Sequence, residues 1–168
     1  MNPITCPFTI RIDDRERRGG YTFEGLHADA DKQHRPLVVP TAECRLVTGD
    51  YTLAGAEDRI AIERKTLNDL YGTLGQGRDQ FRAEHERMAE LEFAAVVIEA
   101  SLATAIARPP AESRLRPICV YRTFISWSLR YGVHWWFAGS RRGGEKTTFH
   151  VLRKFWEYAD IGGQDHGT

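Results

Sequence analysis

The sequence has few cysteines, few lysines and no excess of charge of either sign. Its 168 residues contain three cysteines, and Lys+Arg and Asp+Glu number 23 each. Cys6, Cys44 and Cys119 stand far apart and in no metal-binding spacing, so we expect neither a disulfide framework nor a structural zinc site. A net charge of zero excludes a uniformly basic protein that coats nucleic acid. The cysteine usage predicts a reducing, intracellular environment.

Long hydrophobic runs are also missing. No apolar run approaches the roughly 18 residues of a membrane span, and the first residues lack the charged and apolar regions of a signal peptide. We therefore expect no membrane partner. With 42% hydrophobic residues, a chain of this length suits one globular domain. We expect a single domain over residues 1–160 and a flexible tail over residues 161–168.

The hydrophobic pattern predicts alternating strands and helices. Short apolar runs predict strands over 8–12, 37–46, 51–53, 59–64, 93–98 and 133–138. Helical spacing predicts helices over 67–74, 79–92, 117–131 and 146–158, with a loop around 109–110. Early strands followed by helix and strand units indicate an α/β fold, with a mixed central sheet flanked by helices. In such sheets, ligands gather where strands end and loops converge.

Three residues in one short segment carry the clearest chemical signal. Residues two apart in a strand point to the same face, so Glu63 and Lys65 project together while Arg64 points away. Residues 51–62 have about the length of a hairpin, which returns Asp50 to the side of Glu63. Two carboxylates can hold one Mg²⁺, which keeps waters and takes a substrate phosphate. A lysine beside that water can orient the nucleophile or balance negative charge.

A plain alternative is that these residues form an ordinary solvated strand end. The wider pattern argues against it. Two other predicted strands also end in acid, at Asp13 and Glu99, and Arg78 begins the helix after the glycine break. Strand ends that gather acids and a basic group at one edge of a sheet are typical of an active site.

At this point the residues resemble a known family. Ile12 to Glu16, Gly49-Asp50, Glu63-Arg64-Lys65 and Asp69 are similar to the XPF-type structure-specific endonucleases, whose nuclease motif is GDx(n)ERKx(3)D. The likeness extends over nearly the whole chain. It implies the restriction-endonuclease-like fold and a DNA endonuclease that depends on Mg²⁺ or Mn²⁺. Such an enzyme hydrolyses phosphodiesters at flap, branched or junction DNA and leaves a 5′-phosphate and a 3′-hydroxyl.

The resemblance also implies roles for individual residues. Asp50 and Glu63 correspond to the metal ligands, Lys65 to the catalytic lysine, and Asp13 to a further acid that contacts the metal or its water. The residues that correspond to supporting positions are Arg64, Asp69, Arg15, Glu16, Arg78 and Glu99. Arg82 stands where the family is expected to have a glutamine, so its contacts are not transferred.

We expect the DNA to be bound either by residues of this domain or by a partner protein. The sequence contains no tandem helix-hairpin-helix module of the kind that usually follows the nuclease domain. Arg78, Arg141 and Arg142 are therefore candidate DNA contacts, alongside a separate DNA-targeting protein. The family and the aromatic helix over 118–130 predict a homodimer or heterodimer, with Tyr121, Phe124 and Trp127 as candidate interface residues.

Two other functions remain open on the sequence. One is a non-catalytic DNA-binding or dimerisation scaffold of the same fold. The other is a restriction or mobile-element nuclease directed by a partner, in place of a role in DNA repair or recombination. The intact acid and lysine motif favours a catalyst over the scaffold.

Overall fold

Six strands of the computed structural model form one mixed sheet in the order β4-β2-β5-β6-β7-β8. The structure describes residues 2–17, 19–28, 31–159 and 161. The strands of this sheet are β2 (Ile10–Asp13), β4 (Thr41–Cys44), β5 (Tyr51–Leu53), β6 (Ile60–Lys65), β7 (Phe93–Ile98) and β8 (His134–Phe137). β5 is antiparallel to both β2 and β6, whereas β6, β7 and β8 run parallel to one another. The expected mixed sheet is confirmed.

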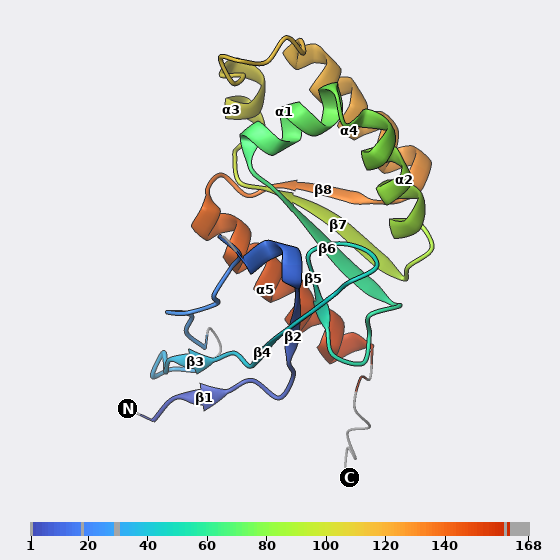
Figure 1. Cartoon of the computed structure of the whole chain (residues 1–168). Helices are drawn as coiled ribbons and strands as arrows, with labels where there is room; N and C mark the ends of the chain where they lie inside the picture. The colour runs from blue at the N-terminus through green and yellow to red at the C-terminus, as the bar shows by residue number, and fades with distance from the viewer. Residues whose placement is uncertain (1, 18, 29–30, 160, 162–168) are drawn as a thin grey trace.

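Helices cover the two faces of this sheet (Figure 1). One face carries α1 (Leu67–Gly75), α2 (Arg78–Met88) and α4 (Pro117–Tyr131), with the short α3 (Leu102–Ala107) against α4. The other face carries α5 (Arg141–Tyr158), which packs on β5, β6 and β7. A 3₁₀ turn, η1 (Asp14–Arg17), follows β2. No helix in the described part of the chain is long and apolar enough to cross a membrane.

Strand β7 shows why both faces are covered. Its residues are apolar at every position, and their side chains alternate between two cores. Ala95 and Val97 pack with Phe149 of α5, whereas Val96 and Ile98 pack in the core beneath α1, α2 and α4. An apolar run of this length with no polar alternation predicts a central parallel strand, and that prediction is confirmed.

Three features differ from the expectation. Helix α5 begins at Arg141, five residues before the predicted start, because Ser140 accepts a hydrogen bond from the Gly143 N–H and caps it. Helix α3 was not predicted, and a serine at position 101 caps it in the same way. Strand β1 (Ile4–Thr5) was also missed; it pairs in parallel with β3 (Leu37–Val38), because the strand predicted over 37–46 divides into β3 and β4.

The predicted tail falls almost wholly outside the described residues. Ile161, its first residue, packs against the core beneath α5. Residues 162–168 are not among those that the structure describes.

A buried histidine lies in an aromatic box between α2 and α4. His85 is fully buried, and its ring lies within 6 Å of those of Phe81, Trp127, Tyr131 and Trp135. The Nδ1–H donates to the Phe81 carbonyl at 2.9 Å, while Nε2 has no hydrogen-bond partner. Burial therefore lowers the pKa of His85 to about 4.

This histidine should make the fold sensitive to acid. In the unfolded chain the histidine pKa is about 6.5, so protons favour unfolding as the pH falls below 6.5 towards 4. Because of this histidine, the free energy of unfolding should fall by on the order of 3 kcal/mol over that pH range. We expect His85→Phe, which keeps an aromatic ring in the box, to lose less stability between pH 7 and pH 4 than the wild type. Urea unfolding at a series of pH values measures this, and parallel profiles for the two proteins would contradict it.

Candidate active site

Strand β6 separates two sets of polar side chains. Glu63 and Lys65 point to the face covered by α1 and α2, and Arg64 points to the face covered by α5, as period-two alternation predicts. Lys65 Nζ lies 2.5 Å from Glu63 Oε1 and 5.0 Å from the centre of the Phe81 ring. The acid and the lysine are therefore paired on one face of the strand.

Asp50 reaches the same strand from the turn before β5. Its Oδ2 accepts the Arg64 backbone N–H at 2.8 Å, and its own N–H donates to the Ile62 carbonyl at 2.8 Å. Gly49 makes this turn possible, because its φ is +72°, and a Cβ there would lie 3.0 Å from the Cβ of Ala61. The antiparallel pairing of β5 and β6 thus brings Asp50 back beside Glu63, as expected from the sequence.

The two carboxylates are in an environment that disfavours their charge. Burial raises the pKa of Asp50 well above its usual value, and the nearby charges of Glu63 and Glu16 raise it further. Burial also raises the pKa of Glu63, although the ammonium of Lys65 opposes the shift. A hard divalent cation bound between two buried carboxylates offsets their unfavourable negative charge, and carboxylate oxygens are its preferred ligands. The residues present therefore fit Mg²⁺ or Mn²⁺.

Lys65 remains charged in this setting. Burial lowers its pKa, but the attraction of Glu63 outweighs burial, and the net shift is upward. At neutral pH the side chain is an ammonium that donates hydrogen bonds. It is suited to orient a water or to balance negative charge, and not to accept a proton.

Asp13 occupies a different position from the one expected of a metal ligand. Both of its carboxylate oxygens are engaged, by the guanidinium of Arg15 at 2.6 and 3.0 Å and by the N–H of Leu46 at 2.8 Å. These bonds lower the pKa of Asp13 despite its burial. Among the described residues, no three His, Cys, Asp or Glu side chains are gathered closely enough to hold a metal ion. We therefore remove Asp13 from the metal ligands and assign it, with Arg15, to fixing the end of β2.

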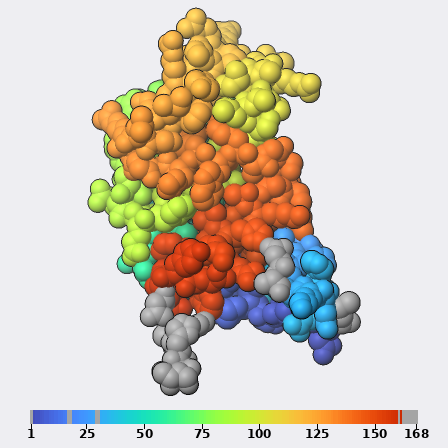
Figure 2. All heavy atoms as spheres, turned by 180° about the vertical axis from the view of Figure 1, so that it is seen from behind, coloured from blue at the N-terminus to red at the C-terminus, as the bar shows by residue number. Residues whose placement is uncertain are grey.

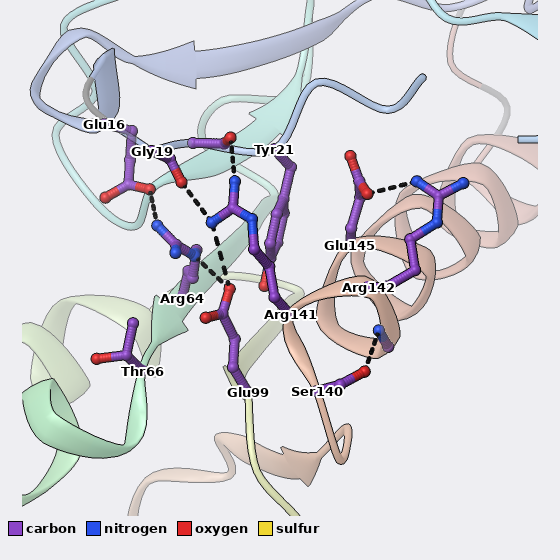
Figure 3. Close-up of polar contacts among 12 residues, drawn as sticks. Glu16, Gly19, Tyr21, Arg64, Thr66, Glu99, Ser140, Arg141, Arg142 and Glu145 are labelled. Carbon is purple, nitrogen blue, oxygen red and sulfur yellow. Dashed lines mark hydrogen bonds and ion pairs between the residues drawn. The ribbon is translucent and has the colours of Figure 1, made fainter. Parts of the chain in front are cut away.

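On the opposite face, Arg64 links three elements (Figure 3). Its Nε donates to Glu99 Oε1 at 2.7 Å, after β7, and its Nη1 donates to Glu16 Oε2 at 3.0 Å, in η1. The guanidinium also lies 5.1 Å from the centre of the Tyr21 ring. The expected supporting residues Arg64, Glu16 and Glu99 thus form one brace, on the side of β6 away from Glu63.

Arg141 and Arg142, which were expected to contact DNA, make hydrogen bonds within the domain. Arg141 donates to the carbonyls of Gly19 and Gly20 at 2.6 and 2.7 Å, and Arg142 donates to Glu24 and Gly25. These contacts attach the segment before β3 to the start of α5. The sequence showed two adjacent arginines at a helix start, but it could not show that a distant loop uses their donors.

Glu145 completes this attachment. This buried carboxylate accepts the backbone N–H groups of Thr22 and Phe23 at 3.1 and 2.7 Å and pairs with Arg142 at 2.5 Å. Phe23 has a φ of +58°, so the segment is held in a conformation that few side chains adopt. Glu145 is therefore a structural residue that sequence reasoning did not find.

Two other expected supporting residues stabilise helices. Asp69 accepts the hydroxyl of Thr66 at 2.6 Å, and Thr66 in turn caps α1 by accepting the Asp69 N–H. Arg78 donates from both terminal nitrogens to the hydroxyl of Thr123 at 3.1 Å and lies over the ring of Trp127. Arg78 therefore joins α2 to α4 and uses both terminal nitrogens in doing so.

One acid near the site was missed. Glu84, on α2, accepts the backbone N–H of Gly49 at 2.9 Å, and its charge raises the pKa of Glu63 further. A cavity of about 160 Å³ lies between these groups, and it is lined by Glu63, Lys65, Thr73, Gly77, Gln80, Phe81 and Glu84. No sequence signal marks Glu84, because its position depends on how α2 packs against the turn.

Comparison with known proteins decides the family. The model of the ERCC4 domain matches residues 12–147, which is most of the chain. The chain belongs to the ERCC4 domain family. The resemblance to the XPF-type nucleases is thereby confirmed, and the family has a nuclease-type domain that processes DNA. No curated protein sequence matches the chain.

Two solved structures have the same fold. One is described as XPF from Aeropyrum pernix in complex with DNA, and it is 23% identical with a TM-score of 0.67, covering 89% of this chain and 66% of that one. The other, XPF from Aeropyrum pernix, is 22% identical with the same TM-score, covering 90% of this chain and 67% of that one. This ERCC4 domain thus spans about two thirds of the length of those chains. The expected α/β fold is confirmed.

The turn that carries Asp50 allows a direct test of its geometry. Gly49→Ala should lower the free energy of unfolding by on the order of 2 to 3 kcal/mol, because the positive φ and the close approach to β6 both oppose a Cβ. Gly55→Ala is the matched control, since Gly55 has a φ of +81° but open space around it. That control should cost only about 1 kcal/mol. Equal losses in urea unfolding would show that the turn does not pack against β6 in this way.

Proposed function

We propose that this ERCC4 domain is a metal-dependent DNA endonuclease. The observation that carries the proposal is the pair of desolvated carboxylates, Asp50 and Glu63, held beside the ammonium of Lys65 on one face of β6. A structural ion-pair network does not need two acids with raised pKa values on one side of a strand. Hydrolysis of a phosphodiester does need such a set.

The residues suited to hold Mg²⁺, or Mn²⁺, are Asp50 and Glu63. When bound, such a cation lowers the pKa of a coordinated water and neutralises charge on the phosphate. Two carboxylates leave most coordination positions to waters and substrate oxygens, which is the usual arrangement for Mg²⁺.

The remaining roles belong to the side chains of the domain. Lys65, which stays protonated, holds the attacking water in line and balances the charge that develops on the phosphate oxygens. The Arg64 backbone N–H fixes one oxygen of Asp50, so that the other is left for binding. Glu84 accepts the Gly49 N–H and so holds the turn against α2. Hydrolysis leaves a 5′-phosphate and a 3′-hydroxyl.

The substrate proposed is DNA with a branch, a flap or a junction between single and double strands. The motif over residues 49–69 supports this choice, because it is similar to that of structure-specific nucleases. One of the two similar Aeropyrum pernix structures is a complex with DNA. A separate DNA-targeting protein could direct the domain, and repair and recombination are the processes in which such substrates arise.

The first test is cleavage of labelled DNA resolved on gels. Fork, 3′-flap, single-stranded and plain duplex DNA are each incubated with Mg²⁺, Mn²⁺ or EDTA. We expect cleavage with metal only, and we expect Asp50→Asn and Lys65→Ala to slow it by at least about 100-fold, because each removes charge or a ligand at the reacting phosphate.

Asp79→Asn is the matched control, since its side chain is exposed at the start of α2 and pairs only weakly with Arg82. It should cleave at the wild-type rate. Binding without cleavage in the wild type, with every substrate and metal, would point to the scaffold function. Cuts fixed by sequence in plain duplex would point to a restriction activity.

We also propose that the domain pairs with a second copy through α4. Ile118, Tyr121, Ile125 and Leu129 recur at helical spacing and are 41%, 41%, 40% and 82% exposed. Of the expected interface residues only Tyr121 is on this stripe. Trp127 is buried in the core, and Phe124 packs against that core.

This pairing predicts the behaviour of charged variants. Ile125→Arg with Leu129→Arg should convert the dimer to a monomer, because both place a charge in the apolar stripe. Val47→Arg is the control, since Val47 is 86% exposed but lies outside α4. Sedimentation equilibrium gives the mass, and an unchanged mass for the double variant would remove α4 as the interface.

A further inference from the structure

One segment of this neutral chain is strongly basic. From Ala100 to Gly144 the sequence contains seven arginines and no lysine, against a single acidic residue, Glu112. This segment includes α3, the loop after it, α4 and the start of α5. Figure 2 shows the yellow and gold part of the segment at the end of the molecule away from the blue N-terminal residues. Arg141 and Arg142 lie elsewhere, against residues 19–25. The arginines at the end of α3, in the loop after it and at the start of α4 therefore place positive charge at this end of the domain.

Four of these arginines have no partner within the described part of the chain. Arg108, Arg114, Arg116 and Arg122 are exposed, and no hydrogen bond, ion pair or aromatic contact engages their guanidinium groups. Every other arginine with a described side chain contacts an acid, a hydroxyl, a carbonyl or an aromatic ring. A free guanidinium keeps five N–H donors in a fork that matches a phosphate. The unpartnered arginines thus gather on one loop and the first turns of α4.

The loop with these arginines forms one wall of a cleft. The cleft has a volume of about 690 Å³, and its other wall is formed by Asn68, Gly72 and Gly75 of α1 and by Gln76 just after it, opposite Ser113 and Arg114. Thr73 and Gly77, from the same stretch of chain, line the cavity that contains Glu63 and Lys65. The cleft and the active-site cavity are therefore neighbours on either side of the end of α1.

The glycines of α1 point to a ligand outside the protein. A glycine within a helix costs about 1 kcal/mol relative to alanine. Neither Gly72 nor Gly75 has a positive φ, and a Cβ at either position would meet no atom of the protein within 4 Å. Internal packing and backbone conformation thus give no reason for glycine at these two positions. The close approach of another molecule to the helix would give such a reason, because a side chain there would be in its way.

The start of α4 adds to the positive charge. Arg116 is its N-cap, no side chain caps it, and Pro117 occupies the first turn. The first N–H groups of the helix and the positive end of its dipole therefore face the same region as the free arginines.

We propose that Arg108, Arg114 and Arg116, with the cleft beside α1, bind the phosphate backbone of the DNA that extends from the cleaved bond. Arg122 is left out, because it lies beside Ile118 and Ile125 on the face of α4 proposed to pair with a second copy. The part of this proposal that links the bound DNA to the cleaved bond rests on the proposed nuclease function. The arginines replace Arg78, Arg141 and Arg142, whose donors are used inside the domain. Guanidinium contacts to phosphate oxygens carry no sequence information, so we expect this contact to be independent of sequence and to weaken with salt.

The test measures binding without cleavage. Fluorescence anisotropy of labelled fork DNA is recorded in EDTA at a series of salt concentrations, with Asp50→Asn as the background. Changing Arg108, Arg114 and Arg116 to glutamine should weaken binding at least tenfold at ~100 mM salt and reduce the slope of log K against log salt by about 3. Gly75→Leu, which fills the cleft, should weaken binding several-fold without lowering the melting temperature.

The matched control removes the same charge elsewhere. Arg11, Arg35 and Arg59 each face an acid, and their joint change to glutamine should alter affinity less than twofold. Equal weakening by both triple variants, or none by either, would overturn the proposed surface. Because binding is read separately from cleavage, the surface can fail while the wild type still cuts DNA. The nuclease can equally fail while the arginines still bind.

Discussion

The structure around the site depends on the fixed position of one strand residue, Arg64. Its guanidinium is held between Glu16 and Glu99, and its backbone N–H is bonded to Asp50. Because side chains alternate along β6, fixing Arg64 on the α5 face fixes Glu63 and Lys65 on the other. A brace of charged groups on one side of the sheet thus determines the chemistry on the other side. A lysine at position 64 would keep the charge but would lose the fork that joins two acids.

This arrangement places stability and function in opposition. Asp50 and Glu63 are held where burial, together with the charges of neighbouring acids, raises both pKa values, so the folded domain is less stable at neutral pH than it would be with neutral side chains there. The large apolar cores on both sides of the sheet offset this cost. Unfavourable charge of this kind is typical of sites that bind a cation or stabilise a transition state.

The central site was predictable because its signals are local. Period-two alternation placed Glu63 against Arg64, and the short hairpin returned Asp50 to β6. The fold followed from the apolar run of β7 and the spacing of the helices. The remaining contacts were not predictable, because they depend on which distant groups meet. The partners of Arg141 lie more than 100 residues away, and Glu84 contacts the turn only through the packing of α2.

The active site and the proposed DNA surface share the end of α1, which divides the cleft from the cavity. With this division, the cleft can position the DNA backbone while the residues of the cavity act on the reacting phosphate. The claim on which this account depends is that Asp50 and Glu63 together hold the metal. Crystals of the domain soaked in Mn²⁺ test it directly by anomalous diffraction. One peak is expected between these two carboxylates, and it should be lost in Asp50→Asn. A peak at Asp13, or none near β6, would contradict it.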